Sequence, residues 1–191
     1  MRLLYIDACF RGAESRTRRI ARPVLEALSK RYEIDRIDLG ELSLVPVQAD
    51  ALSARFRGEV DRESLSLAER VRDADRIVIA APFWDMSFPS ALKVFFERCS
   101  LLDVTFANGA DACVGLCRSE KLLFITTRGM DISTGDPLEQ ATPYLRALSH
   151  LWGIGETFTV SAQNMDYVDA DDAEERLRRA IGEGLALAET F

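Results

Sequence analysis

The segment APFWDMSFP concentrates flat and apolar side chains in a short stretch that contains two prolines. Pro82 follows a hydrophobic run and Pro89 precedes a helical pattern, and because each proline fixes its own φ, the chain direction is restricted at both ends. The residues that follow the first proline are Phe83, Trp84, Asp85 and Met86. Such a loop could hold a planar aromatic ligand against its apolar groups while backbone N–H and C=O groups bond the ligand's edge. The alternatives are a core plug and an oligomer interface.

Helical spacing already explains Phe88, Phe95 and Phe96, which we therefore expect to be packing residues. Trp84 stands beside an acid in a loop, so burial explains it less well. We expect Trp84 to be the aromatic residue that meets a ligand.

A second segment, DACFRGAESRT at residues 7–17, combines hydroxyl groups with positive charge near the start of a helix. Ser15 and Thr17 would lie at the helix N-terminus, where free N–H groups and the helix dipole favour a phosphate. The alternative is that Ser15 is only an N-cap. The segment lacks both GxGxxG and GxxxxGK[ST], which excludes the dinucleotide fingerprint and the P-loop.

A third segment, TTRGMD, carries Thr127, Arg128 and Gly129 at the end of another hydrophobic run. Gly129 allows a close approach of the backbone, and Arg128 could offset negative charge on a bound group. Taken alone, this motif is weak.

The elements that must position these segments alternate along the chain. Strand-like runs cover residues 2–7, 32–39, 76–81, 121–127 and 156–161, and helical patterns lie between and after them. The third and fourth runs are almost wholly hydrophobic, as in strands buried on both faces. This order predicts a doubly wound α/β sheet, which binds ligands beyond the carboxyl ends of its strands.

Two stretches fit this pattern poorly. Pro23 interrupts the first helical pattern, so that helix either kinks there or begins later than Ser15. Residues 42–63 are the least regular part of the sequence and are expected to form a surface excursion.

Composition limits the partners. The chain has 191 residues, 48% of them hydrophobic and 29% charged, which fits one domain over residues 1–191. A net charge of -7 opposes binding to nucleic acid or anionic lipid and favours a small-molecule partner. The amino terminus reads as a strand rather than a signal peptide, and no uncharged run is long enough for a bilayer, so we expect a cytoplasmic protein.

Four cysteines and one histidine offer little metal chemistry. Cys9, Cys99, Cys113 and Cys117 are too few for a disulfide scaffold of this length and suit reduced thiols. A zinc site at His150 would need carboxylates to complete it, so no metal is expected.

Taken together, five segments resemble the FMN-dependent NADH-azoreductase and NAD(P)H:quinone oxidoreductase family, which has a flavodoxin-like fold. In order they are LYIDACFRGAESRTRR, APFWDMSFPSALKVFFE, VTFANG, KLLFITTRG and TPYLRALSHLWGIGE. The resemblance covers almost the whole chain, and its most specific part is the aromatic loop followed by FPSALKVFFE. It implies five parallel strands in the order 2-1-3-4-5 with helices on both faces.

The resemblance also implies the cofactor contacts. The phosphate of FMN would lie near Ser15 and Thr17, with Cys9 at the foot of the same loop. The ring would be lined, mainly through main-chain groups, by Pro82, Phe83, Trp84, Asp85 and Met86, and its pyrimidine side would meet Thr127, Arg128 and Gly129. Two positions depart from the family pattern, since Cys9 stands where many relatives carry serine and Met130 where a second glycine is common.

The implied reaction is a two-step exchange. NAD(P)H passes hydride to flavin N5 and leaves, and a quinone, azo or nitro compound then takes the electrons. Arg128 and the Gly129 amide would stabilise the anionic reduced flavin, and no side chain is assigned a proton-transfer role. A homodimer in which each active site is completed by the neighbouring subunit is also implied. The aromatic helix near residues 88–102 and Phe106 fit such an interface or an ordinary core equally well.

Two other functions are compatible with an α/β sheet of this kind. A flavodoxin-type electron carrier would share the fold and FMN but would need no nicotinamide. A receiver-like signalling module would need paired acids at strand ends, where only Asp7 stands out. The sequence leaves open the physiological acceptor, the choice between NADH and NADPH, and the role of residues 42–63.

Overall fold

Five hydrophobic strands pair in parallel into one sheet in the computed structural model, which describes residues 1–191. They are β1 (Arg2–Asp7), β2 (Glu33–Asp38), β3 (Arg76–Ala80), β6 (Lys121–Thr127) and β7 (Glu156–Ala162). Their order is β2-β1-β3-β6-β7, which is compatible with the expected 2-1-3-4-5 once the strands outside the sheet are left out of the count. The expected strand limits agree with the observed ones to within one residue at each end.

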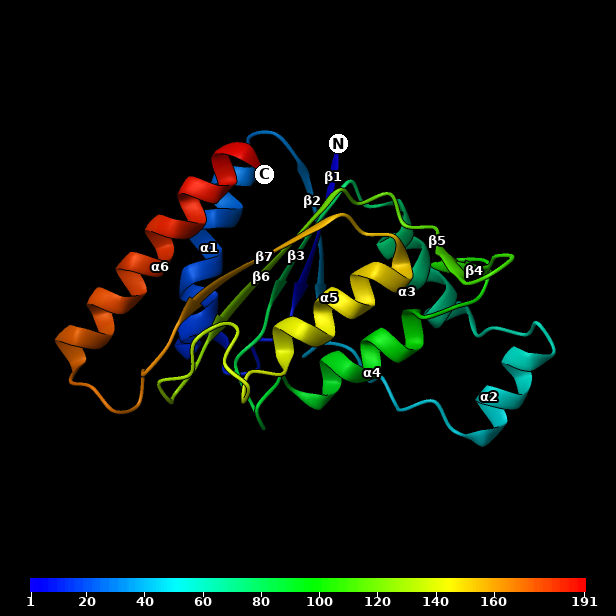
Figure 1. Ribbon diagram of the computed structural model, residues 1–191, viewed down its shortest axis with the longest axis horizontal. Coiled ribbons are helices and arrows are strands. Elements are labelled where there is room, and N and C mark those ends of the chain that lie inside the picture. The colour runs from blue at the N-terminus through cyan, green and yellow to red at the C-terminus, as the bar shows by residue number, and fades with distance from the viewer.

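Helices cover both faces of the sheet (Figure 1). One face carries α1 (Arg16–Leu28) and α6 (Ala170–Thr190), and the other carries α3 (Arg62–Asp73), α4 (Ser90–Cys99) and α5 (Ala141–Trp152). Side chains of β3 alternate between the two cores, since Ile77 and Ile79 belong to one and Val78 and Ala80 to the other. This explains why β3 has no polar face in the sequence.

Three helices begin at side-chain caps. Ser15 accepts a hydrogen bond from the Arg18 N–H at the start of α1, Asp61 accepts one from Ser64 in α3, and Asp169 accepts one from Asp172 in α6. The α1 helix begins directly after Ser15 and continues through Pro23, so the later start, one of the two alternatives, is excluded. Proline lacks an N–H, and α1 therefore forgoes one backbone hydrogen bond in its interior.

Two helices are shorter than the sequence patterns predict, since apolar spacing places Leu102 in the helix after Pro89 and Leu138 in the helix that contains Tyr144 and Trp152. Ser100, with φ -75 and ψ 83, leaves the helical conformation, so α4 ends before Leu102, which is exposed. Leu138 lies before α5 because its N–H donates to the Asp136 carboxylate in a local turn, and it is also exposed. The aromatic residues Phe88, Phe95 and Phe96 are buried in the core, which confirms that they are packing residues.

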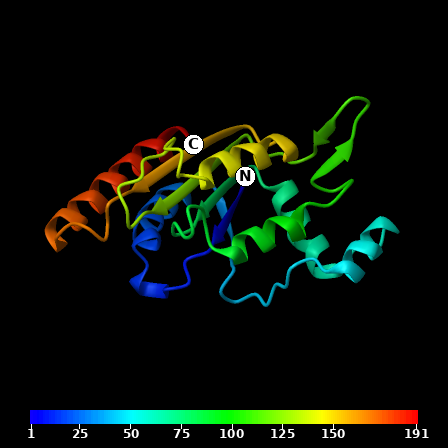
Figure 2. The same ribbon diagram turned by 60° about the horizontal axis from the view of Figure 1, so that its bottom comes forward.

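The stretch at 42–63 is more regular than expected, because it contains α2 (Ala49–Phe56). No residue of α2 is buried, and Figures 1 and 2 show it standing away from the sheet. Its Arg55 side chain donates to the carbonyls of Glu97 and Arg98 at 3.0 and 3.3 Å, at the end of α4. With eight residues, α2 has only about two turns, which are too few for its apolar spacing to give a helical signal.

A small hairpin beside α5 was not expected at all. Its strands β4 (Phe106–Asn108) and β5 (Cys113–Gly115) are antiparallel and have three residues each, too few to show an alternating pattern. The hairpin packs on the carboxyl end of α5, where Cys117 N–H donates to the Trp152 carbonyl at 2.9 Å. Gly115 and Gly153 meet backbone to backbone at this contact.

All four cysteines are free thiols. Burial raises the pKa of both Cys9 and Cys117 to about 12 and also raises that of Cys99. None of the helices combines the length and the apolar character that crossing a membrane requires.

Candidate functional site

The loops that follow β1, β3 and β6 meet at the carboxyl edge of the sheet and form a cleft of about 190 Å³. All the residues expected at the site line this cleft except Asp85 and Met86. The structure adds five residues that the sequence did not single out as ligand contacts: Phe10, Arg11, Arg16, Met165 and Asp166.

One end of the cleft is the N-terminus of α1. Ser15 Oγ accepts from the Arg18 N–H at 3.2 Å, and the Arg19 N–H donates to the Ser15 carbonyl at 3.1 Å. The first N–H groups of a helix have no partner within it, so those of Arg16 and Thr17 are left without a protein acceptor. Ser15 is therefore an N-cap and a cleft residue at the same time. This end of the cleft has the donors that a phosphate group requires.

Thr17 and Thr127 join the two sides of the cleft. Their hydroxyl oxygens lie 2.7 Å apart in a hydrogen bond that connects α1 to the end of β6. Thr17 is buried, so this bond fixes the first turn of α1 against the sheet. The helix N-terminus is thereby held beside the TTRG loop.

Cys9, in the loop after β1, also lines the cleft. Its thiol is buried and lies 3.5 Å from the Ala80 carbonyl, while its N–H donates to the Asp7 carboxylate at 3.0 Å. With a pKa raised to about 12, mainly by burial, the thiol is neutral at physiological pH. Cys9 therefore adds no charge to the cleft.

The Asp7 carboxylate forms ion pairs with two arginines. It is 2.8 Å from Arg36 and 2.9 Å from Arg18. Burial opposes its ionisation, but the hydrogen bonds from Arg36, the Cys9 N–H and Arg18 outweigh that effect and hold the pKa of Asp7 below its ordinary value. Asp7 is thus a structural ion-pair residue rather than the free acid that a receiver-like module would need.

A larger groove of about 350 Å³ lies beside this cluster, between α1 and β2. It includes Tyr5, Asp7, Arg18 and Arg36 but none of the loop residues after β3 or β6. The side chains that line it carry charged groups that are already paired, since Asp7 binds Arg18 and Arg36, and Arg22 binds Glu26. The smaller cleft is the better candidate site, because it alone combines loops from three strands with a helix N-terminus.

The aromatic loop forms the other end of the cleft. Phe83 N–H donates to the Thr127 carbonyl at 3.1 Å, which ties the loop to the end of β6. Trp84 is 46% exposed and packs beside Phe10, with ring centroids 6.1 Å apart. An exposed indole at the mouth of a cleft is available to a flat ligand.

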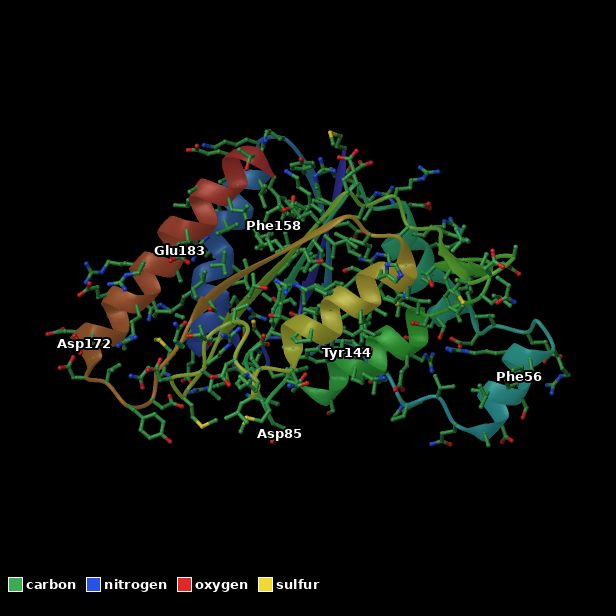
Figure 3. All side chains as sticks on the ribbon, viewed as in Figure 1. Phe56, Asp85, Tyr144, Phe158, Asp172 and Glu183 are labelled. Atoms are coloured by element: carbon green, nitrogen blue, oxygen red, sulfur yellow. The ribbon has the colours of Figure 1, made fainter.

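Asp85 and Met86 occupy the tip of a tight turn rather than the cleft lining. Trp84 and Ser87 exchange backbone hydrogen bonds of 3.2 and 2.8 Å, and the two residues between them have positive φ values of 48 and 62. This is the pattern of a type I′ hairpin turn, which glycine and asparagine favour and methionine does not. Figure 3 shows Asp85 at the lower rim of the molecule. The main chain of the turn therefore holds backbone strain beside the cleft.

Replacing Met86 with glycine is expected to raise the free energy of unfolding by about 1 kcal/mol, because glycine adopts positive φ without a steric cost. Denaturation in urea measures the change. Met130 is a matched control, since Met86 and Met130 are 38% and 37% exposed and only Met86 has a positive φ. Met130→Gly should lower stability, and equal changes in the two variants would contradict strain at Met86.

The Arg128 side chain has protein partners of its own. Its guanidinium is fully buried and donates to the Ile132 carbonyl at 2.8 Å and to Thr134 Oγ1 at 2.9 Å. Glu139 lies 3.9 Å away, and the Phe83 ring centroid is 5.6 Å from Arg128 Cζ. Burial lowers the pKa of Arg128. The side chain holds the loop after β6, and its expected role of offsetting charge on a bound group stays a prediction.

Asp166 is the main residue that the sequence did not reveal. A Cβ built on Gly129 would lie 2.1 Å from Asp166 Oδ2, so glycine is what lets this carboxylate approach the loop after β6. Asp166 also forms an ion pair with Arg16 at 2.6 Å, although the two residues are 150 positions apart. No local pattern in the sequence marks a contact of that range.

The residues present fit a ligand with a phosphate and a flat ring. Unpaired N–H groups lie at the α1 end, an exposed indole lies at the other, and the Gly129 N–H between them also has no protein acceptor. This is the donor set that a flavin mononucleotide requires.

Comparison with known proteins gives one family. The Flavodoxin_2 model, described as a flavodoxin-like fold, matches residues 1–185. The chain is 32% identical over 199 residues to an FMN-dependent NADH:quinone oxidoreductase of Clostridium perfringens, covering 100% of this chain and 99% of the relative. A protein of Clostridium acetobutylicum named FMN-dependent NADH:quinone oxidoreductase 2 has the same identity and coverage.

Solved structures agree in fold. An azoreductase from Bacillus anthracis str. Sterne superposes with a TM-score of 0.87 at 20% identity, covering 100% of both chains. An FMN-dependent NADH-azoreductase from Bacillus anthracis str. Ames Ancestor, solved in complex with FMN, has a TM-score of 0.86 at 22% identity, with 100% of this chain and 99% of that chain covered.

Proposed function

This chain belongs to the flavodoxin-like family and is homologous to FMN-dependent NADH:quinone oxidoreductases, and we propose on that basis that it is an FMN-dependent NAD(P)H oxidoreductase. Its acceptors are quinones and azo compounds, as the names of its relatives indicate, and nitro aromatics belong to the same proposal. The observation that carries the proposal is the cleft itself. It joins a helix N-terminus with free N–H groups to an exposed aromatic loop.

At the α1 end, the residues bind and orient the phosphate. The N–H groups of Arg16 and Thr17 donate to it, and the helix dipole adds a favourable positive potential. Ser15 holds the first turn of α1 by capping it, and Thr17 keeps that turn against β6 through Thr127. Cys9 packs below as a neutral thiol, which leaves the phosphate to be held by backbone donors.

At the other end, the loop after β3 orients the ring. Pro82, Phe83 and Trp84 line this side, with Asp85 and Met86 on the turn at its rim. The Gly129 N–H is directed to the edge of the ring in this proposal, since it has no protein acceptor. Arg128 contributes by holding its loop in place, and its buried guanidinium lies behind Phe83.

FMN, when bound, would supply the redox chemistry, a two-step exchange of electrons between NADH or NADPH and the acceptor. The protein's own part is to bind, to orient and to exclude water. A donor at Gly129 would stabilise negative charge that develops on the ring during reduction. No side chain in the cleft is required to move a proton.

The test is a flavin titration followed by reduction. We expect the purified chain, loaded with FMN, to be yellow, and anaerobic NADH or NADPH to bleach it quickly, with menadione or an azo dye restoring the colour. Absorbance in the flavin band follows each step. A protein that binds no FMN would contradict the proposal. Binding with very slow bleaching would instead favour the electron carrier, which the names of the relatives do not support.

The proposal also covers domain organisation, assembly and location. Residues 1–191 form a single domain, two copies of the chain form a homodimer, and the protein is cytoplasmic. Exposed apolar groups on α2 support an interface, since Phe56 is 85% and Leu52 48% exposed. Free cysteines are consistent with a reducing compartment. Sedimentation of the loaded protein would give twice the chain mass if the dimer forms and the chain mass if it does not.

A further inference from the structure

The ion pair between Arg16 and Asp166 lies in the lining of the cleft, beside the N-terminus of α1. Arg16 is the first residue of α1, so its side chain starts beside the N–H groups that were assigned to the phosphate. Its Nη1 lies 2.6 Å from Asp166 Oδ1, and both residues line the cleft. This charge-assisted bond takes up one of the five N–H donors of the guanidinium and offsets its charge, so an anion that approaches Arg16 meets a cation that already has a partner.

The backbone holds Asp166 in this position. Its N–H donates to the Gly129 carbonyl at 3.1 Å, and the preceding residues donate to the same loop, Asn164 to Met130 at 2.8 Å and Met165 to Arg128 at 3.1 Å. The absence of a side chain at Gly129 provides the space that the carboxylate occupies. Asp166 is therefore a fixed part of the cleft wall.

The other arginines near this end also have carboxylate partners. Arg11 lies 3.3 Å from Glu14, and Arg18 is bonded to Asp7. Arg19 pairs with Glu174 at 2.7 Å. A phosphate that enters the cleft carries about two negative charges and must compete with a carboxylate for any arginine that it engages. Arg16 is the arginine nearest to the helix N-terminus by sequence, and its competitor is Asp166.

We propose that Asp166 is a built-in counter-ion that competes with the phosphate of FMN for Arg16 and so limits the affinity of the cleft for phosphorylated flavins. The inference rests on the proposed function and deepens it. Riboflavin has the same ring but no phosphate, so it leaves the Arg16–Asp166 pair undisturbed. Asp166 therefore sets how strongly the cleft distinguishes FMN from riboflavin.

The experiment measures the dissociation constants of FMN and riboflavin by fluorescence titration at low ionic strength. Asp166→Asn should bind FMN about two- to fivefold more tightly than the wild type, the range expected for a partly exposed ion pair. Riboflavin affinity should not change. In an Arg16→Gln background, Asp166→Asn should have a smaller effect on FMN, because the arginine that the carboxylate withheld is gone.

Glu183→Gln is the matched control for net charge. It also removes one negative charge. Glu183 does not line the cleft, and Figure 3 shows it on α6, away from the labelled Asp85 at the lower rim. It should change neither dissociation constant. Asp166→Ser removes the carboxylate by a different substitution and should reproduce the ratio of FMN to riboflavin affinity found for Asp166→Asn.

Two results would overturn the inference. Weaker FMN binding in Asp166→Asn would mean that the carboxylate positions Arg16 for the phosphate, and an equal change for both flavins would mean that the substitution acts on the loop. Wild-type protein that binds neither flavin would overturn the proposed function as well. If the wild type binds FMN but Asp166→Asn has the same ratio of FMN to riboflavin affinity as the wild type, this inference alone is overturned.

Discussion

Gly115→Ala is expected to lower the free energy of unfolding by about 3 kcal/mol, at the upper end of the cost of overpacking. A Cβ at this position would lie 2.0 Å from the Gly153 nitrogen and 2.1 Å from the Trp152 carbonyl carbon. These are backbone atoms, so no rotation of a side chain relieves the clash. The hairpin β4–β5 would have to move away from the end of α5. Urea denaturation followed by far-UV circular dichroism measures the loss.

Gly182→Ala is the control for that substitution. Gly182 lies inside α6, and nothing is within 4 Å of the Cβ that alanine would add. Alanine should therefore raise stability by about 0.5–1 kcal/mol through its higher helix propensity. A loss of similar size in both variants would show that close packing at Gly115 is not the cause.

Glu139→Ala should cost about 3–5 kcal/mol, because it leaves the buried Arg128 guanidinium without a counter-charge. Both side chains are fully buried. Glu139 Oε1 also accepts the Thr142 N–H at 2.8 Å at the start of α5, and that bond is lost with the carboxylate. Thermal and urea unfolding report the change, and the flavin is not needed for the measurement.

Two further variants separate the contributions. Glu139→Gln keeps an oxygen acceptor for the Thr142 N–H and removes only the charge, so the drop in its free energy of unfolding measures the ion pair. The further drop in Glu139→Ala measures the hydrogen bond at the start of α5. Replacing both Arg128 and Glu139 with leucine should cost less than the sum of the single replacements, because no unpaired charge then remains buried. Additive losses would contradict coupling between the two groups.

The sheet could be predicted from the sequence because its strands are strong local signals. Runs such as RIVIA in β3 are buried on both faces and contain no competing pattern. The hairpin β4–β5 escaped prediction because three-residue strands carry too few positions to show alternation. The helix α2 escaped because it buries nothing, and an amphipathic pattern arises from burial.

The site could be predicted in part. The loops after three strands were expected to converge, and the cleft brings Ser15, Phe83 and Gly129 together. Side-chain direction was beyond reach, which is why Arg128 was expected to face a ligand although its guanidinium bonds to Ile132 and Thr134. The roles assigned to these residues toward FMN remain predictions.

The way α2 is attached also bears on how this protein can change over evolutionary time. Because α2 buries no side chain and is held through Arg55 to two carbonyls at the end of α4, most substitutions within it remove no core contact. Apart from Leu52 and Phe56, which support the proposed dimer interface, such a segment can accumulate mutations while the sheet and the cleft of the single chain keep their geometry. New acceptor preferences or new partners could therefore arise in α2 without loss of the fold.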